Sequence, residues 1–292
     1  MAYPDAMLFL FLNQPTDRQY IPRQAEGAEI PRIIHQTYHA EDGLPTAIRD
    51  CIAALRAENP GWNYRFYDDD ATEQFIQEAY GPEVLAYFNR IDSRYGAARA
   101  DLFRYLLMYR VGGVYVDIKS TARRPLDEMI RPDDRLILAQ WPQHGRFEGA
   151  GRHDWDFAGK IEGGEFQQWH VICAPGHPYL YAVIQAVMRN IDCYIPRMHG
   201  SGRNAVLRMT GPIAYTLAIL PLLPLNQHRL VKDHEELGLV YSVYAQNTDH
   251  KRLFGTHYAE LTAPIVWPTL FRRCLSALYG VFDTLRKCRW IV

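Results

Sequence analysis

The sequence predicts an α/β fold in which helices flank a mixed sheet. The first observation is a set of short β-branched and aromatic runs, such as residues 30–38 and 114–116, which have the composition of buried strands. The second is that these runs alternate with stretches such as 97–109, where apolar residues recur at helical spacing. Alternating strands and helices favour an α/β sheet, and a hydrophobic content of 48% in 292 residues allows a sizeable core.

Glycine and proline residues mark the ends of the expected elements. Residues 59–61 (Asn-Pro-Gly) end the first helix, Gly112 and Gly113 end the helix that begins at Ala97, and residues 175–176 (Pro-Gly) close a late strand. The expected order is strand 30–38, helix 46–58, strand 62–67, a helix after Asp70, helix 97–109, strands 114–116, 136–139 and 171–174, and helices 181–189 and 213–219.

Three parts are expected along the chain. Residues 1–29 form an N-terminal extension, residues 30–265 form the α/β domain, and residues 266–292 form an amphipathic, basic, α-helical C-terminal appendage. Within 269–292 apolar residues recur at helical spacing, and five basic residues stand against one acidic residue. This segment either rests on anionic lipid as a peripheral membrane helix or docks on the core.

Charge and cysteine content exclude several classes of protein. A net charge of -1 argues against a nucleic-acid partner. Five scattered cysteines without a CxxC pair argue against a zinc site or a disulfide framework. The apolar run at 7–12 is too short for a signal peptide, and no run approaches the ~20 apolar residues that span a bilayer. We therefore expect a cytoplasmic protein, in contact at most with the inner face of the cytoplasmic membrane.

Polar side chains follow three of the predicted strands. They lie at residues 35–37 (His-Gln-Thr), at 68–70 (three aspartates) and at 117–119 (Asp-Ile-Lys). In open α/β sheets ligands bind at the carboxyl ends of the strands, so these ends converge on one crevice if the strands are neighbours. Carboxylates there can hold ribose hydroxyls or a divalent cation, and arginine suits phosphate or a structural carboxylate.

The same segments resemble glycosyltransferase family 32, the DXD-containing sugar transferases. The resemblance lies in the opening strand at 30–37, in residues 59–69, and in the block at 98–117 that contains ARADLFRY and GGVYVD. Large clostridial glucosylating toxins contain a block that is distantly similar to residues 98–117. The resemblance covers residues 30–120 and continues weakly through 174–178 and 210–212.

The resemblance implies a GT-A fold, a nucleotide-sugar donor, a glycan acceptor and a transfer that retains the anomeric configuration. It places Asp101 and Arg104 at the donor sugar or in the organisation of the site, and Asp117 at ribose or metal. The donor-binding residues that it implies are His35, Gln36, Thr37, Asp69, Arg99, Asp101, Arg104, Tyr105, Gly113, Tyr115 and Asp117. The expected catalytic residues are Asp117, Asp101, Arg104, Lys119 and Glu165.

Several of these residues also have a structural interpretation. Asp101 and Arg104 have the spacing of a helical i,i+3 ion pair, and the aspartates at 68–70 can cap the helix that follows them. His35 can be a core histidine, and Lys119 a solvated lysine at a strand end.

Lys119 stands where the family motif has its second carboxylate, usually the direct metal ligand. A protonated lysine cannot ligate a hard cation, which leaves two solutions. Either Lys119 itself neutralises the diphosphate, or Asp117 holds Mn²⁺ or Mg²⁺ with ligands from the C-terminal part. Candidates for those ligands are Asp249, His250 and His257, of which we favour His257.

Residues 148–170 are rich in Gly, Trp, His and acidic residues, as in an acceptor loop with sugar-stacking indoles or in an ordered surface loop. The acceptor residues we expect are Trp155, Asp156, Gln168 and Trp169, and Glu165 and Asp156 are the candidate nucleophiles. The predicted function is sugar transfer to a glycan or lipid-linked glycan in bacterial capsule, O-antigen or lipopolysaccharide synthesis. The alternatives are a toxin-like transferase acting on protein and a degenerate, non-catalytic nucleotide-sugar-binding protein.

Overall fold

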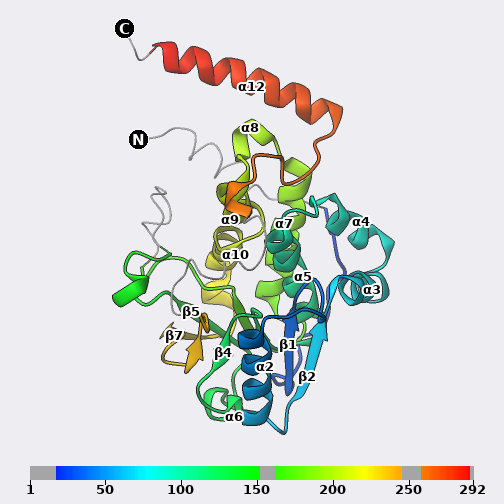
Figure 1. The fold of residues 1–292 in the computed structure, drawn as a ribbon. Helices are drawn as coiled ribbons and strands as arrows, with labels where there is room; N and C mark the ends of the chain where they lie inside the picture. The colour runs from blue at the N-terminus through cyan, green and yellow to red at the C-terminus, as the bar shows by residue number, and fades with distance from the viewer. Residues whose placement is uncertain (1–17, 152–161, 245–257, 290–292) are drawn as a thin grey trace.

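The computed structural model describes residues 18–151, 162–244 and 258–289. Its centre is a mixed six-stranded sheet in the order β2-β1-β3-β6-β5-β7 (Figure 1). The strands are β1 (Ile33–Thr37), β2 (Asn63–Tyr67), β3 (Gly113–Val116), β5 (Leu136–Gln140), β6 (His170–Cys173) and β7 (Arg229–Asp233). β1 runs parallel to β2 and β3, β6 runs antiparallel to β3 and β5, and β5 runs parallel to β7. The predicted mixed α/β sheet is therefore confirmed.

Helices cover both faces of this sheet (Figure 1). The longer ones are α2 (Thr46–Glu58), α3 (Asp69–Tyr80), α4 (Pro82–Arg90), α5 (Gly96–Val111), α7 (Pro178–Cys193), α9 (Gly202–Met209), α10 (Pro212–Ile219) and α12 (Leu270–Arg289). The shorter elements are β4 (Thr121–Ala122), α6 (Leu126–Met129), η1 (Gly145–Phe147), α8 (Pro196–His199), η3 (Leu220–Leu225), β8 (Leu239–Val240) and η4 (Tyr258–Glu260). The helices expected at 46–58, 97–109, 181–189 and 213–219 are all present, as are the strands expected at 62–67, 136–139 and 171–174.

Alternation along β3 divides the core into two layers. Tyr115 packs with the apolar side chains of α5, α7 and α10 on one face of the sheet. Val114 and Val116 pack on the other face, with side chains such as Leu55 of α2 and Leu126 of α6. Successive residues of a strand point to opposite faces, so each strand contributes to both layers.

Helix α5 runs through the core, with every residue from Asp101 to Tyr109 buried. A helix buried on all sides has no polar stripe, which explains why its sequence is apolar almost all round. It ends at Gly112, whose φ of 69° lies in the left-handed region and whose N–H donates to the Met108 carbonyl. A side chain at Gly112 would come within 2.6 Å of the Pro175 nitrogen, so the chain needs glycine there.

Helix α4 was not expected from the sequence. Gly81, with a φ of 82°, separates α3 from α4, and Pro82 occupies the first turn of α4. Proline fits that position because its missing N–H would be unpaired in any case. The break turns α4 away from α3 at the edge of the site described below.

The two ends of the described chain behave differently. Residues 18–29 lie against the core: Ile21 is buried, and Tyr109 Oη accepts from the Gln24 N–H at 2.7 Å. Helix α12 contacts α8 at the end of the molecule away from the sheet (Figure 1). Leu270, Phe271 and Leu278 of α12 are each about two-thirds exposed or more, at 75%, 67% and 66%.

One stretch of the described residues, Gly202–Leu225, is long and apolar enough to cross a membrane by length and composition alone. It comprises α9, α10 and η3, and half of the most apolar window is buried inside the protein. α9 and α10 pack against α5 and α7, so burial in the core accounts for the apolar composition.

Candidate functional site

A cavity of about 530 Å³ opens at the carboxyl ends of β1 and β3. Its lining comes from the end of β1 and the two residues after it (37–39), from the start of α3, from residues 93–104 before and within the first turns of α5, from residues 115–119, and from Tyr241. The predicted convergence of strand ends thus occurs, because β1 and β3 are parallel neighbours. Of the residues predicted from the sequence, Thr37, Asp69, Arg99, Arg104, Tyr115, Asp117 and Lys119 line this cavity.

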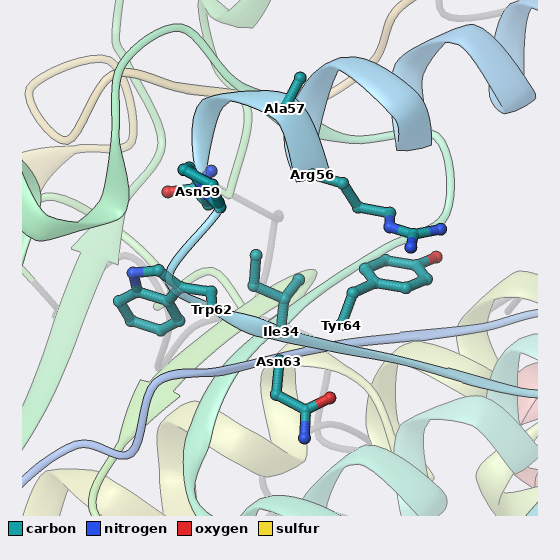
Figure 2. Close-up of a pocket in the computed structure, with 8 residues that line it drawn as sticks. Ile34, Arg56, Ala57, Asn59, Trp62, Asn63 and Tyr64 are labelled. Carbon is teal, nitrogen blue, oxygen red and sulfur yellow. The ribbon is translucent and has the colours of Figure 1, made fainter.

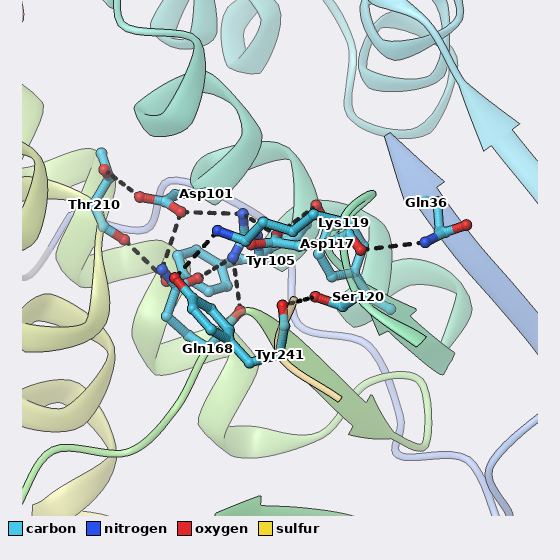
Figure 3. A network of polar contacts seen from close by, with 11 residues as sticks. Gln36, Asp101, Tyr105, Asp117, Lys119, Ser120, Gln168, Thr210 and Tyr241 are labelled. Carbon is cyan, nitrogen blue, oxygen red and sulfur yellow. Dashed lines mark hydrogen bonds and ion pairs between the residues drawn. The ribbon is translucent and has the colours of Figure 1, made fainter. Parts of the chain in front are cut away.

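Arg104 is the centre of a polar network at the wall of the cavity. Figure 3 labels its partners Asp101, Asp117 and Gln168. Its guanidinium lies 3.3 Å from the Asp101 carboxylate and 3.1 Å from that of Asp117. It also donates to the main-chain carbonyl of Gln168 at 2.7 Å and to the side-chain oxygen of the same residue. The guanidinium carbon lies 4.8 Å from the centre of the Tyr115 ring. Burial alone would lower the pKa of Arg104, but Tyr115 and the two carboxylates outweigh it and raise that pKa, so the charge is fixed.

Asp101 supports Arg104 from below. Its carboxylate accepts hydrogen bonds from Thr210 at 2.9 Å and from the Gln168 amide at 3.1 Å, and its side chain is only 4% exposed. The i,i+3 ion pair with Arg104 therefore exists, but it is buried rather than on a helix surface. Asp101 is not part of the cavity lining, so it acts on the site through Arg104.

Asp117 stands where the buried network meets the cavity. Its side chain is 24% exposed, and one carboxylate oxygen lies between Arg104 and, at 3.5 Å, the Tyr115 hydroxyl. Its backbone is also held: the Asp117 N–H donates to the Trp169 carbonyl at 2.9 Å, and the Gln36 amide donates to the Asp117 carbonyl at 3.2 Å. The carboxylate is thus presented to the cavity at a fixed position.

Lys119 follows on the same wall and has an aromatic partner. Its Nζ lies 4.4 Å from the centre of the Tyr241 ring and donates to the Tyr241 hydroxyl at 3.1 Å. Tyr241 comes directly after β8, whose pairing with β4 brings this late part of the chain to the site. Tyr241 is not predictable from the local sequence, because nothing in its pattern indicates that pairing.

Other predicted donor residues lie behind the cavity rather than in its wall. His35 is fully buried between the Tyr67 hydroxyl at 3.2 Å and the Gly112 carbonyl at 3.0 Å, and burial lowers its pKa to about 4. Gln36 is fully buried and bonded to Tyr64, and Tyr105 is buried with its hydroxyl on the Thr210 carbonyl at 2.9 Å. These side chains support the strand and helix that carry the lining residues.

Gly113 contributes space rather than a side chain. Its φ is 105°, and a Cβ there would come within 2.5 Å of the Ile33 carbonyl of the neighbouring strand. Glycine therefore allows β3 to begin directly beside β1, which positions the lining residues that follow it.

At the start of α3 the three aspartates have separate roles. The Asp68 side chain accepts from the Ala71 N–H at 2.8 Å and so caps the helix. Asp69 lines the cavity, and burial raises the pKa of its carboxyl. The helix cap and the cavity lining thus come from neighbouring aspartates.

The residues expected at the acceptor are only partly described. Gln168 bridges Asp101 and Arg104, and Trp169 is buried against His170 and Tyr241. Glu165 is buried and accepts from the Trp141 indole at 3.3 Å, away from the cavity lining. Trp155, Asp156, Asp249, His250 and His257 lie outside the described residues, so their assignments stay predictions.

The residues described at this site do not fit the metal ligand set of a DXD motif. Asp117 is the only carboxylate that the variant motif supplies, and one of its oxygens already pairs with Arg104. The next motif position carries the ammonium of Lys119, which repels a dication. Within the described ranges no group of three or more His, Cys, Asp and Glu side chains could hold a metal ion.

A second cavity, of about 520 Å³, lies beside the end of α2 and the start of β2 (Figure 2). Arg56 lies over the Tyr64 ring at 5.3 Å, and Trp62 forms another part of the wall. The Asn59 amide is already used, donating to the Leu55 carbonyl and accepting from the Leu126 N–H, both at 2.8 Å. This cavity lacks the charged network of the first, so the first is the candidate site.

Comparison with known proteins finds similarity over the part of the chain that carries most of the cavity lining. Residues 45–137 match the family described as the glycosyltransferase sugar-binding region containing DXD motif. The initiation-specific alpha-1,6-mannosyltransferase of Schizosaccharomyces pombe is 26% identical over 213 residues, which are 67% of this chain and 49% of that protein. The mannosyl phosphorylinositol ceramide synthase SUR1 of Saccharomyces cerevisiae is 35% identical over 101 residues, which are 35% of this chain and 25% of that protein.

This chain thus spans about half the length, or less, of these curated relatives. Among solved structures, the UDP-bound glycosyltransferase domain from the YGT toxin has a TM-score of 0.50 at 8% identity, covering 79% of this chain and 83% of that one. The fold is therefore of the GT-A type, as the sequence predicted. Residues 45–137 are thus similar to the DXD-containing sugar-binding region of glycosyltransferases.

Proposed function

We propose that this protein is a glycosyltransferase that moves a hexosyl group from a nucleotide-sugar donor to a glycan or lipid-linked glycan. The observation that supports this most is the cavity at the ends of β1 and β3, where Arg104, Asp117 and Lys119 lie together. The family match over residues 45–137 includes all three of these residues.

In the proposed reaction the bond between the anomeric carbon and the diphosphate breaks, an acceptor hydroxyl oxygen forms the new bond to that carbon, and the hydroxyl proton passes to the leaving diphosphate. Negative charge grows on the leaving diphosphate as this happens. Fixed positive groups at the end of the cavity stabilise it, and such preorganised electrostatic stabilisation is usually a large part of catalysis. Asp117 is placed to accept hydrogen bonds from ribose or sugar hydroxyls.

The proposed donor carries a mannosyl group or a related hexose. The relatives named above are a mannosyltransferase and a mannosyl phosphorylinositol ceramide synthase. Retention of the anomeric configuration, implied by the family resemblance, also belongs to this proposal. Glu165 lies outside the cavity lining, which favours assistance by the leaving phosphate over attack by that carboxylate.

A lipid-linked acceptor is the form of the proposal that α12 favours. Trp267, Leu270 and Phe271 are 65%, 75% and 67% exposed, and Arg272 and Arg273 follow directly. Exposed aromatic and aliphatic side chains beside basic residues suit the surface of an anionic membrane. Assignment to bacterial capsule, O-antigen or lipopolysaccharide synthesis, and to the cytoplasmic side of a membrane, stays a prediction.

The test of the activity is a hydrolysis and transfer screen of UDP- and GDP-sugars, with Mn²⁺, with Mg²⁺ and with EDTA. We expect turnover of one donor, lost in Asp117→Ala and kept in Asp133→Ala, which removes an exposed carboxylate outside the cavity lining. Donor binding without turnover of any sugar would instead support the non-catalytic alternative.

The test of the membrane contact is sedimentation with vesicles of phosphatidylglycerol and phosphatidylcholine. We expect the wild type to sediment with anionic vesicles at low salt, and Leu270→Ser with Phe271→Ser to stay in solution. Equal sedimentation of the variant would contradict a role for α12.

A further inference from the structure

We propose that Lys119, held in place by Tyr241, replaces the divalent cation at the diphosphate of the donor. The inference rests on the proposed donor site and adds the group that neutralises the leaving diphosphate. Lys119 stands where the DXD pattern has its second carboxylate, and the described residues at the site do not supply a set of metal ligands.

The charges around the cavity single out Lys119. Within the described part of the lining, three other Lys or Arg side chains are present, and each pairs with a carboxylate. These pairs are Arg94 with Asp92 at 2.6 Å, Arg99 with Glu73 at 2.8 Å, and Arg104 with both Asp101 and Asp117. Among the described residues, the hydrogen-bond partner of the Lys119 ammonium is the hydroxyl of Tyr241 and not a carboxylate. Its charge is therefore available to an anion in the cavity.

Tyr241 fixes the position of that charge. The ring and hydroxyl of Tyr241 contact Nζ at 4.4 Å and 3.1 Å, respectively. The backbone is fixed as well, since the Val243 N–H donates to the Lys119 carbonyl at 2.9 Å and the Ser120 hydroxyl donates to the Tyr241 carbonyl at 2.7 Å. A cation held in this way needs little reorganisation when an anion binds. Tyr241 is thus a positioning residue for Lys119.

Arg104 and Asp117 complete the arrangement. Arg104 also lines the cavity, but Asp101 and Asp117 already compensate its charge, so among the described lining residues Lys119 is the cation left for a diphosphate. The Asp117 oxygen that pairs with Arg104 is not free to serve as a metal ligand without loss of that ion pair. Lysine is a compact point charge that suits phosphate, which makes a metal ion unnecessary at this position.

Isothermal titration calorimetry with UDP and GDP, in EDTA and in Mn²⁺, tests the inference. Uridine and guanosine serve as probes that lack the diphosphate. The variants are Lys119→Ala, Lys119→Asp, Tyr241→Phe and, as the matched control, Lys232→Ala, an exposed lysine on β7 outside the cavity lining. Unfolding curves for each variant separate a loss of binding from a loss of fold.

We expect the wild type to bind UDP or GDP in EDTA with little change on adding Mn²⁺. Lys119→Ala should weaken that binding about tenfold to hundredfold, the range of one charge-assisted hydrogen bond, and leave nucleoside binding unchanged. Tyr241→Phe should weaken it less, and Lys232→Ala not at all. Lys119→Asp should lose binding in EDTA and regain it in Mn²⁺, because it restores the second motif carboxylate.

Two results would overturn the inference while leaving the donor site intact. They are wild-type binding that requires Mn²⁺, and binding in EDTA that Lys119→Ala does not weaken. If neither diphosphate binds with or without metal, the proposed donor site itself is wrong, and this inference is wrong with it.

Discussion

Replacement of Asp101 by alanine tests whether the buried network beneath the cavity is structural support. Asp101 accepts from Thr210 at 2.9 Å and from Gln168 at 3.1 Å, and it lies 3.3 Å from Arg104. Removing one partner of a buried ion pair costs about 3–5 kcal/mol, because the other charge stays buried without its partner. Asp117 still compensates part of the Arg104 charge, while Thr210 and Gln168 lose an acceptor. We therefore expect Asp101→Ala to lower the free energy of unfolding by about 3–5 kcal/mol. This loss is a large part of the ~5–15 kcal/mol typical of proteins.

Asp117→Ala is the comparison that separates support from function. Its carboxylate is 24% exposed, so water screens its pair with Arg104, and we expect a loss of only about 1 kcal/mol. Urea unfolding followed by circular dichroism gives both free energies. The loss of nucleotide affinity should instead be larger for Asp117→Ala than for Asp101→Ala, since Asp117 lines the cavity and Asp101 does not.

Equal unfolding free energies for the two alanine variants would refute this division of roles. Asp101→Asn provides a second measurement if Asp101→Ala does not fold, because it keeps the volume and loses the charge. Thr210→Val removes one hydrogen bond to the same carboxylate and should cost about 0.5–1.5 kcal/mol.

Three further predictions follow from burial and backbone geometry. Burial lowers the pKa values of four histidines. The value falls to about 4 for His35, His177 and His199 and to about 3 for His170. Below about pH 6.5 these histidines become protonated in the unfolded chain but not in the native protein. The free energy of unfolding therefore keeps their full contribution above pH 6.5 and falls as the pH drops towards 4. Urea midpoints that stay constant between pH 7 and pH 5 would contradict this. Gly112→Ala forces an alanine into a left-handed conformation against Pro175 and should lower the free energy of unfolding by about 1–3 kcal/mol or more, whereas Gly61→Ala, with open space around it, should cost less; equal melting temperatures would count against the argument. In thiol titration of the native protein, exposed Cys274 should react before Cys173, whose pKa burial raises above its ordinary value; simultaneous reaction would show that the core opens readily.

The layered fold could be predicted because its elements have strong local patterns. The β-branched runs became β1 and β3, and the apolar run at 97–109 became the buried helix α5. By contrast, β7 and the pairing of β4 with β8 were not predicted, because short strands take their place from tertiary partners rather than from local sequence.

The candidate site was predictable as a location but less so as a set of contacts. The strand-end rule located Thr37 and Asp117, since parallel neighbouring strands must end together. It did not distinguish lining residues from their supports, because His35 and Gln36 share a strand with Thr37 but are fully buried. Tyr241 could not be found at all, because it reaches the motif through a strand pairing across more than a hundred residues.

The sheet order has a bearing on synthesis of the chain by the ribosome. β3 pairs with β6, so that Gly113 lies opposite Cys173, sixty residues later in the chain. Helix α5 packs against α7, which follows β6. Until that later part has left the ribosome, the apolar surface of α5 lacks its contacts with β6 and its cover by α7. Nascent chains that end before Pro178 should therefore bind chaperones that recognise exposed apolar segments, and release from them should coincide with the emergence of α7.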